Sequence, residues 1–441
     1  RKIKKKFDTK KFFWLEKKIS EKNYEKIMKL GDKSIKPEEK IRRIYPQKNL
    51  FSHIIGQIDD DNFGISGLEK SFDEFLRKSK KPLKLTVDKD IQFLIRRELI
   101  KYQEIFRSKG SAAILMNVNS GNILSIVSLP DFNPNERKSI TDVNYINRVT
   151  KGTYELGSVF KTFTFAKALN EDLIELETEF LDLPKSINCY GFPIREYDNK
   201  IPSDLTAEQI LIRSGNIGSV RIGQKIGPEK YKSFLEKIGV LSKIEFDIEE
   251  VAPQKNYKFG KCKLATASFG HGIATTVLQL AKGYAIISNG GYDVKPTLIN
   301  KDIKINKKKN RILKKGVSEQ VVNVLRKIVN TEEGTAKFAN VPNFEIAGKT
   351  GTADKVLDGI YSEGKVNTFA SIFPSSSPNY VFIVMLDTPK TSSSYIYNYR
   401  HKEGTQTGTP YNTAGWTSVE VAGKIIDKIG PILATKYIEV N

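Results

Sequence analysis

The stretch Gly157-Ser158-Val159-Phe160-Lys161 stands where a loop passes into an apolar segment. Ser158 and Lys161 are three residues apart, so on a helix they share a face with Cβ atoms about 5–6 Å apart. A serine hydroxyl is a weak nucleophile unless a base takes its proton, and a lysine does so only when neutral. Burial, a helix N-terminus and a second cation would each lower the pKa of Lys161. The spacing therefore predicts a nucleophile with its own base.

The tetrad Ser-x-x-Lys carries little weight alone in a chain rich in lysine. It occurs again at Ser362–Lys365, in a segment containing Gly364, where it indicates an ordinary loop. Ser158 by itself is also a good helix N-cap. A catalytic interpretation therefore depends on further segments.

Ser214-Gly215-Asn216 follows the apolar segment Leu205–Ile212, 56 residues beyond Ser158. Its amide could bind the backbone of a substrate, and its hydroxyl could relay a proton to a leaving group. Three other segments with the pattern Ser-x-Asn indicate turns, namely Ser120–Asn122, Ser186–Asn188 and Ser377–Asn379.

Lys349-Thr350-Gly351-Thr352 is the only Lys-Thr-Gly in the chain and lies on a predicted strand, Glu345–Ala353. Gly351 would permit close approach of a ligand, Lys349 supplies positive charge, and the threonine hydroxyls can bind a carboxylate. The alternative is an edge-strand lysine beside a glycine bulge. The three motifs together, in this order, are typical of penicillin-recognising serine enzymes.

Hydrophobic periodicity predicts an α+β fold. Two apolar strands precede a helical middle third at about 154–290, three follow it, and we expect one antiparallel sheet built from both ends. The predicted strands are Leu83–Val87, Ser111–Val118, Ile123–Leu129, Glu345–Ala353, Asn367–Phe373 and Tyr380–Leu386, the terminal helices are Asp88–Phe106 and Trp416–Ile429, and Thr391–Thr409 is a predicted surface loop.

The 441 residues carry 72 basic and 51 acidic side chains, a net charge of +21. Residues 1–50 hold 18 basic and 7 acidic side chains, so this leader alone carries +11 and we expect it to be attracted to anionic lipid headgroups. No zinc-finger spacing or RNA-binding aromatic signature accompanies the charge, which argues against nucleic acid. No apolar run reaches the roughly 18 residues of a membrane helix.

Cysteine and histidine leave alternatives open. Cys189 and Cys262 either pair in an oxidising compartment or sit as small buried hydrophobes. His53, His271 and His401 are too scattered for a spacing-defined metal site, so we expect no metal.

Over nearly its whole length the chain resembles the class B penicillin-binding proteins, which are monofunctional peptidoglycan transpeptidases. The similar segments are Phe13–Leu15, Arg43–Pro46, His53–Gly56, Gly67–Glu69, Asn147-Arg148, Ser268–Gly272, Asn289–Gly291, Gly334–Ala336 and Ala347–Thr352. The resemblance implies a penicillin-binding-protein/serine β-lactamase-like transpeptidase domain at residues 83–441, with helices on both faces of the sheet and a helical subdomain. Residues 1–82 would be a basic leader and partial pedestal.

The resemblance also implies the chemistry. Ser158 would attack the penultimate D-Ala carbonyl of a stem peptide while Lys161 accepts its proton, and an amine of a second stem peptide would then resolve the acyl-enzyme. Ser214 and Lys349 would pass protons, and Asn216 would hold the peptide backbone. The amides of Ser158 and Thr352 would form the oxyanion hole. Substrate and β-lactam carboxylates would bind Thr350 and Thr352 beside Gly351, and no cofactor is implied.

Glu155–Ser158 and Ser214–Gly218 resemble the division (septal) branch, because the elongation branch typically has an acidic residue where Asn216 stands. We therefore expect a septal enzyme on the outer face of the inner membrane, held by an N-terminal anchor outside this sequence. Its expected partners are a membrane glycan polymerase and other division proteins. The alternatives are an elongation-type transpeptidase, a serine β-lactamase-like hydrolase and a non-catalytic division scaffold.

Overall fold

The computed structural model describes residues 6, 11–16, 19–39, 43–136, 143–249, 252, 256–300, 310–357 and 359–437. The chain forms two compact units, Arg1–Ile44 and Tyr45–Asn441. In the first, helix α2 (Glu21–Met28) begins after Ser20, whose side chain accepts a hydrogen bond from the Asn23 amide. A part of the basic leader lies outside the described residues, and the domain boundary at 82/83 stays a prediction.

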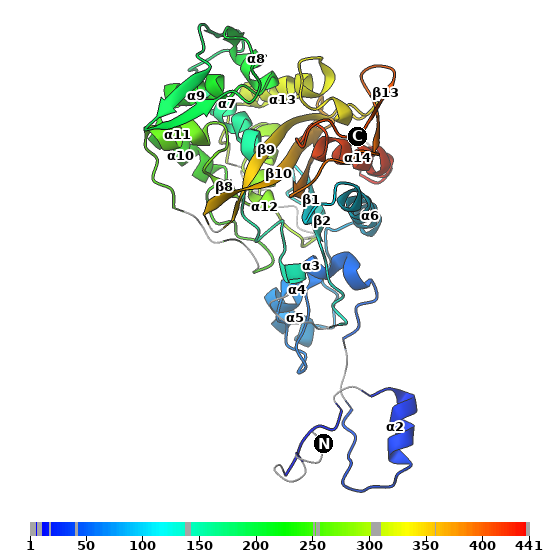
Figure 1. Ribbon diagram of the computed structural model, residues 1–441. Helices are drawn as coiled ribbons and strands as arrows, with labels where there is room; N and C mark the ends of the chain where they lie inside the picture. Colours follow the sequence, from blue (N-terminus) through cyan, green and yellow to red (C-terminus); the bar gives the residue numbers. More distant parts are fainter. Residues whose placement is uncertain are drawn as a thin grey trace. The chain divides into compact units, whose positions relative to one another are not determined.

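A five-stranded antiparallel sheet forms the centre of the second unit (Figure 1). Its strands, in spatial order, are β2 (Ile123–Leu129), β1 (Gly110–Asn117), β11 (Tyr380–Asp387), β10 (Ile360–Phe373) and β9 (Ala347–Leu357). Strand β1 pairs along its whole length with β11, so that Ile114 lies opposite Ile383. The predicted sheet with strands from both ends of the chain is confirmed.

Several local predictions are wrong. Ser186–Asn188, a predicted turn, lies on strand β5 (Ser186–Cys189), and Ser362–Lys365, a predicted loop, lies on strand β10. Leu83–Val87 is not a strand, because Leu85 makes only an isolated bridge to Ile299 while the apolar side chains of this segment pack against the core. The stretch Thr391–Thr409 is not wholly a surface loop, since it contains strands β12 (Ile396–Asn398) and β13 (Thr405–Thr407). Tyr397 is fully buried there against an aromatic cluster that the apolar periodicity did not predict.

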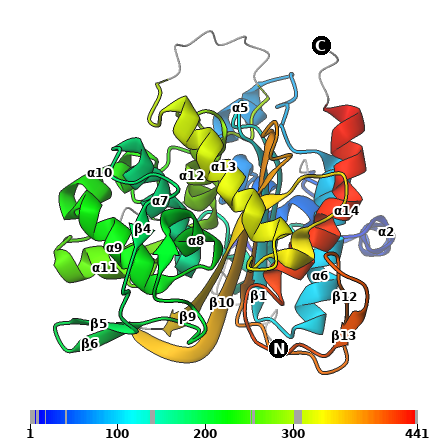
Figure 2. The ribbon, with the colours of Figure 1, turned by 90° about the horizontal axis from the view of Figure 1, so that it is seen from above.

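Helices cover both faces of the sheet, as Figure 2 shows. One face carries α6 (Lys89–Ile105) and α14 (Ser418–Lys436), and the other carries α12 (Val277–Ser288) and α13 (Lys315–Asn330). The predicted cap of α6 is confirmed, because the Asp88 carboxylate accepts hydrogen bonds from the Asp90 and Ile91 amides. Helix α14 runs beyond its predicted end, through Pro431.

The helical subdomain is built around α7 (Lys161–Asn170), whose first nine residues are buried except Lys167. Buried hydroxyls on α7 have partners, since Thr164 bonds the Tyr231 hydroxyl and Thr162 bonds that of Tyr284. The other elements are α8 (Ala207–Ile212), α9 (Asn216–Ile226), α10 (Pro228–Lys237), α11 (Lys261–Ala267), β3 (Tyr154–Glu155), β4 (Glu179–Phe180), β5 (Ser186–Cys189), β6 (Phe192–Arg195), β7 (Leu205–Thr206) and β8 (Ala274–Thr275).

Short elements complete the second unit. They are η1 (Lys48–Phe51), α3 (Ser52–Ile55), α4 (Gly67–Ser71), α5 (Asp73–Lys78), η2 (Val143–Tyr145), η3 (Gly157–Phe160) and η4 (Lys337–Ala339). Within the described ranges, no helix has the length and apolar character needed to cross a bilayer.

Candidate active site

Ser158 lies on the 3-10 turn η3, between strand β3 and helix α7. Its neighbours Val159 and Phe160 are fully buried, whereas Ser158 remains partly exposed. Gly157 has φ +63°, a conformation that glycine adopts without strain. The helix start predicted around Ser158 is therefore a tighter turn, and α7 begins at Lys161.

Glycines let neighbouring backbones approach this turn closely. A Cβ on Gly157 would lie 2.8 Å from the Thr352 carbonyl oxygen, and a Cβ on Gly351 would overlap the Leu156 carbonyl. Strand β9 therefore runs directly beside η3, and the backbones of Gly157 and Thr352 lie next to each other. The close approach expected at Gly351 is made here by the chain's own backbone.

The Lys161 amine is buried, with 1% of the residue exposed. Its Nζ donates to the Ser214 carbonyl oxygen at 2.5 Å, the Ser214 Oγ at 3.2 Å and the Asn216 Oδ1 at 2.7 Å. Among the described residues, no hydrogen bond to the Ser158 hydroxyl is formed. Catalytic hydrogen bonds often form only when substrate is bound, so this geometry is compatible with a later Ser158–Lys161 contact.

Lys349, on strand β9, is also fully buried. Its Nζ donates to the Ser214 Oγ at 2.7 Å and to the Thr350 carbonyl oxygen at 3.3 Å. The Ser214 hydroxyl thus accepts from two lysines that are 188 positions apart in the sequence. Three predicted motifs meet at this one oxygen.

Both lysines lose basicity in this setting. Burial lowers the pKa of Lys161 to about 7, although the Glu196 carboxylate opposes this effect. Burial, followed by the charge of Lys161, holds the pKa of Lys349 well below its ordinary value. Near neutral pH a substantial fraction of Lys161 is therefore uncharged, as a general base must be.

The two threonines of β9 lie beside this cluster with hydroxyls already engaged. The Thr350 Oγ1 is 2.7 Å from the Thr335 Oγ1, and the Thr352 Oγ1 accepts a hydrogen bond from the Ala414 amide at 2.9 Å. An accepting hydroxyl keeps its own proton for donation. Thr352 can therefore still donate to an anion, while Thr335 is a neighbour that the motif does not contain.

Sequence reasoning missed Glu196. Its carboxylate accepts hydrogen bonds from the Asn216 amide at 2.6 Å and the Ile217 amide at 2.8 Å, at the start of α9. The Asn216 side-chain Nδ2 also donates to the Arg195 carbonyl at 2.8 Å. Glu196 lies 18 residues before Ser214 in no recognised motif, so only the folded hairpin brings it to the site.

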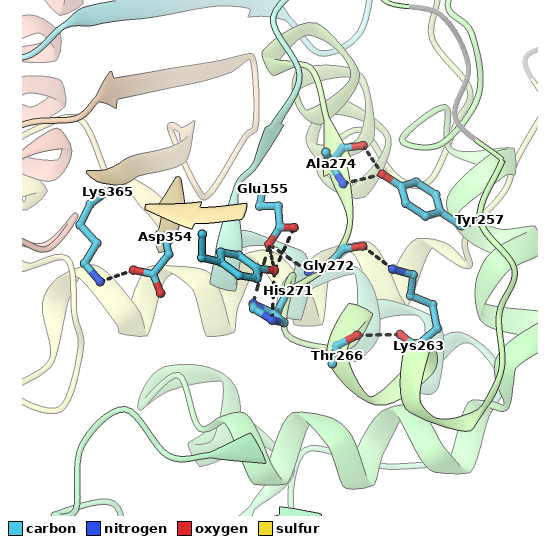
Figure 3. A network of polar contacts seen from close by, with 10 residues as sticks. Glu155, Tyr257, Lys263, Thr266, His271, Gly272, Ala274, Asp354 and Lys365 are labelled. Atoms are coloured by element: carbon cyan, nitrogen blue, oxygen red, sulfur yellow. Dashed lines mark hydrogen bonds and ion pairs between the residues drawn. The ribbon is translucent and has the colours of Figure 1, made fainter. Parts of the chain in front are cut away.

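A second polar network, drawn in Figure 3, surrounds Glu155 on the strand before the nucleophile turn. The Glu155 carboxylate accepts a hydrogen bond from the Gly272 amide at 2.9 Å and from the Tyr361 hydroxyl at 3.2 Å. The His271 ring stacks on Tyr361 with centroids 5.1 Å apart. This network ties β3 to β10 and to the loop before β8, and thereby supports the turn that carries Ser158.

Cys189 and Cys262 form a disulfide that joins β5 to α11. This settles the alternative that the sequence left open. Within the described parts of the chain, no group of three or more His, Cys, Asp or Glu side chains is arranged to hold a metal ion.

Comparisons with known proteins agree with this architecture. The transpeptidase domain of penicillin-binding proteins matches residues 111–404, and the penicillin-binding protein dimerisation domain matches residues 1–104. The chain is 29% identical over 424 residues to the probable peptidoglycan D,D-transpeptidase FtsI of Caulobacter vibrioides, covering 93% of this chain and 69% of that protein. It is 27% identical over 414 residues to FtsI of Escherichia coli K12, covering 87% and 69%.

Two further comparisons extend the picture. Stage V sporulation protein D of Bacillus subtilis is 30% identical over 416 residues, covering 85% of this chain and 64% of that protein. Penicillin-binding protein 3 of Mycobacterium tuberculosis shares the fold, with a TM-score of 0.74, 23% identity and coverage of 91% and 92%. The chain belongs to the class B penicillin-binding proteins, the peptidoglycan D,D-transpeptidases that combine a dimerisation domain with a transpeptidase domain.

Proposed function

We propose that Ser158 is the nucleophile of this transpeptidase and Lys161 its general base. One observation carries the assignment. Three residues after the partly exposed Ser158, the Lys161 amine is buried and its pKa is lowered to about 7. The Ser158 Oγ attacks the penultimate D-Ala carbonyl of a donor stem peptide as its proton passes to the Lys161 Nζ. An ester forms, and the amide bond to the terminal D-Ala breaks.

Proton return uses the oxygen that the two lysines share. Ser214 Oγ lies 3.2 Å from the Lys161 Nζ and 2.7 Å from the Lys349 Nζ, so it can pass a proton to the departing D-Ala amine. In the second half-reaction, the amine of another stem peptide attacks the ester and gives up a proton. The bond from the acyl carbon to the Ser158 Oγ breaks, and the Oγ regains a proton.

The proposed oxyanion hole consists of the backbone amides of Ser158 and Thr352. The contact of Gly157 with the Thr352 backbone supports this pairing, because it brings the two segments together. Donors of this kind contribute about 2.7–4 kcal/mol each in other acyl-transfer enzymes. Thr350 and Thr352 would bind the terminal carboxylate beside Gly351 and next to Lys349, and Asn216 would hold the donor backbone.

We place the enzyme in septal cell-wall synthesis, outside the cytoplasmic membrane. The names of its FtsI relatives support the division branch, and the Cys189–Cys262 disulfide is typical of an oxidising compartment. An N-terminal membrane anchor, a membrane glycan polymerase and other division proteins belong to this proposal. Localisation of a fluorescent fusion of the full-length protein tests it, since an even distribution along the cell wall would favour an elongation role.

The assignment of Ser158 is tested by intact-protein mass spectrometry after exposure to a fluorescent penicillin. The wild type should gain one stable adduct, and Ser158→Ala should gain none. Ser362→Ala is the matched control, because it removes the serine of the second Ser-x-x-Lys, whose hydroxyl donates to the Lys355 carbonyl and accepts from the Gly364 amide. It should label like the wild type.

Each other outcome has a defined meaning. Labelling that survives in Ser158→Ala would remove the proposed nucleophile. A label lost within minutes would indicate a β-lactamase-like hydrolase. No label on the wild type would indicate a scaffold.

A further inference from the structure

The hairpin of β5 and β6 with its exit, residues 186–197, is held by specific contacts rather than by a core. Tyr190 and Phe192 at its tip are 85% and 78% exposed, and Ile194 is its one buried residue. A hairpin with so little buried apolar surface is marginal by itself. Its position over the subdomain must therefore come from the bonds that it makes.

Three consecutive residues of the 186–197 hairpin bond the segment that carries Ser214 and Asn216. The Arg195 carbonyl accepts from the Asn216 Nδ2 at 2.8 Å, and the Tyr197 hydroxyl donates to the Arg213 carbonyl at 2.9 Å. Between them, the two Glu196 carboxylate oxygens accept the Asn216 and Ile217 amides. The 186–197 hairpin therefore forms hydrogen bonds to the chain on both sides of Ser214.

The turn at Ser214 depends on contacts from other segments of the chain. Ser214 has φ +59°, a left-handed conformation that strains a residue other than glycine. Helix α9 starts after Gly215, which has no side chain to cap the first amides. The Glu196 carboxylate caps them from another segment, where the helix dipole also favours a negative charge.

The disulfide fixes the far end of the 186–197 hairpin. Cys189 ends β5, and its partner Cys262 lies on α11, which packs against α9. The hairpin is therefore tied covalently to a neighbour of the very helix whose start it caps. Loss of the disulfide would leave the hairpin attached mainly through the polar contacts of residues 195–197.

We propose that Glu196 is a positioning residue of the transpeptidase, which holds Ser214 and Asn216 against the Lys161 amine and is itself kept in place by the Cys189–Cys262 disulfide. The proposal rests on the function proposed above for Lys161. Asn216 Oδ1 and the two Ser214 oxygens are the groups that bond this amine, and Glu196 bonds the backbone that carries them.

The charge of Glu196 gives the proposal a specific signature. The Glu196 carboxylate raises the pKa of Lys161 against the effect of burial, while the charge of Lys161 helps to lower the pKa of the neighbouring Lys349. Replacing Glu196 by glutamine keeps a hydrogen-bond acceptor but removes the charge, so the pKa of Lys161 should fall further. A simple loosening that admitted water would instead raise that pKa, because it would relieve the burial.

The test is the rate of acylation by a fluorescent penicillin as a function of pH in the full chain. We expect Glu196→Gln to be acylated at least about 10-fold more slowly than the wild type, as for a misplaced catalytic group. The midpoint of its rate-against-pH curve should move to lower pH. Glu196→Asp should recover part of the rate and the wild-type midpoint. Acylation should also be slower in the double variant Cys189→Ser/Cys262→Ser and in reductant-treated wild type. In both cases the pH midpoint should not move to lower pH.

Glu333→Gln is the matched control, because Glu333 bonds the side chain of Arg213 beside the same turn but no backbone amide of α9. It should match the wild type. An unchanged rate in Glu196→Gln would overturn the proposal, and so would a slower rate with an unmoved midpoint, which would indicate a purely structural role. Ser158→Ala in the same series keeps the two questions separate. Its continued labelling would contradict the proposed function, whereas loss of its label together with an unchanged Glu196→Gln would overturn only the positioning role of Glu196.

Discussion

The chain contains two Ser-x-x-Lys tetrads with the same spacing and different surroundings. Among the described residues, Lys161 is buried and bonds only neutral oxygens, whereas the Lys365 side chain is 38% exposed and pairs with the Asp354 carboxylate (Figure 3). An ion pair with a carboxylate favours the charged amine, and burial among neutral oxygens favours the uncharged one. The surroundings of the lysine, rather than the tetrad itself, therefore create the base.

The largest expected effect comes from replacing Lys161 by alanine, with Lys365→Ala as the matched control. Lys161→Ala should slow acylation by penicillin by about 100-fold to 10,000-fold, the usual contribution of a positioned general base. Lys365→Ala should acylate like the wild type, since it loses only a surface ion pair. Stopped-flow measurement of the acylation rate decides the matter, and equal losses in both variants would break the comparison.

A smaller effect is expected from the backbone contact that brings β9 to the nucleophile turn. In Gly351→Ala the new Cβ would overlap the Leu156 carbonyl, and backbone shifts of this kind cost about 1–3 kcal/mol. Acylation should slow and the melting temperature should fall. Gly316→Ala is the control, because nothing lies within 4 Å of its added Cβ. If Gly351→Ala behaved like the control, the two segments would not be in contact.

The smallest effect on acylation is expected from Tyr284→Phe, which acts on stability. The Tyr284 hydroxyl donates to the Val159 carbonyl at 2.9 Å and bonds Thr162, so it ties the nucleophile turn to α12. Its removal should cost about 1–3 kcal/mol of unfolding free energy, because a buried carbonyl loses its partner. Tyr411→Phe, at a site that is 66% exposed, should leave stability unchanged in denaturant titrations. Equal midpoints for both variants would contradict this role.

The sequence was sufficient for the sheet and for three motifs, because their signals are local. Continuous apolar runs at the central strands, the Asp88 cap and the lone Lys-Thr-Gly at Lys349 are each visible within about ten residues. The Leu83–Val87 strand failed because an apolar extended segment can pack on the core without joining a sheet. Local pattern does not distinguish these two cases.

Non-local contacts are what the sequence did not reveal. Glu196 acts on Asn216 only because a hairpin folds back, and Thr335, in the loop between α13 and η4, meets Thr350 on β9. The choice between paired and free cysteines likewise depends on the distance between the two Cα atoms. That distance is 5.6 Å in the fold, but the separation of 73 residues in the sequence does not indicate it. Such contacts are set by tertiary packing, so single-sequence motifs cannot contain them.

The most direct test of the account is the pH dependence of wild-type acylation by penicillin, measured from about pH 5 to pH 9. Because burial lowers the pKa of Lys161 to about 7, the amine is protonated and inactive as a base below that pH and uncharged above it. The rate should therefore rise with pH, with a midpoint near 7, and level off above it. A rate that is flat across this range, or that still climbs steeply at its upper end as an ordinary lysine would require, would contradict the account.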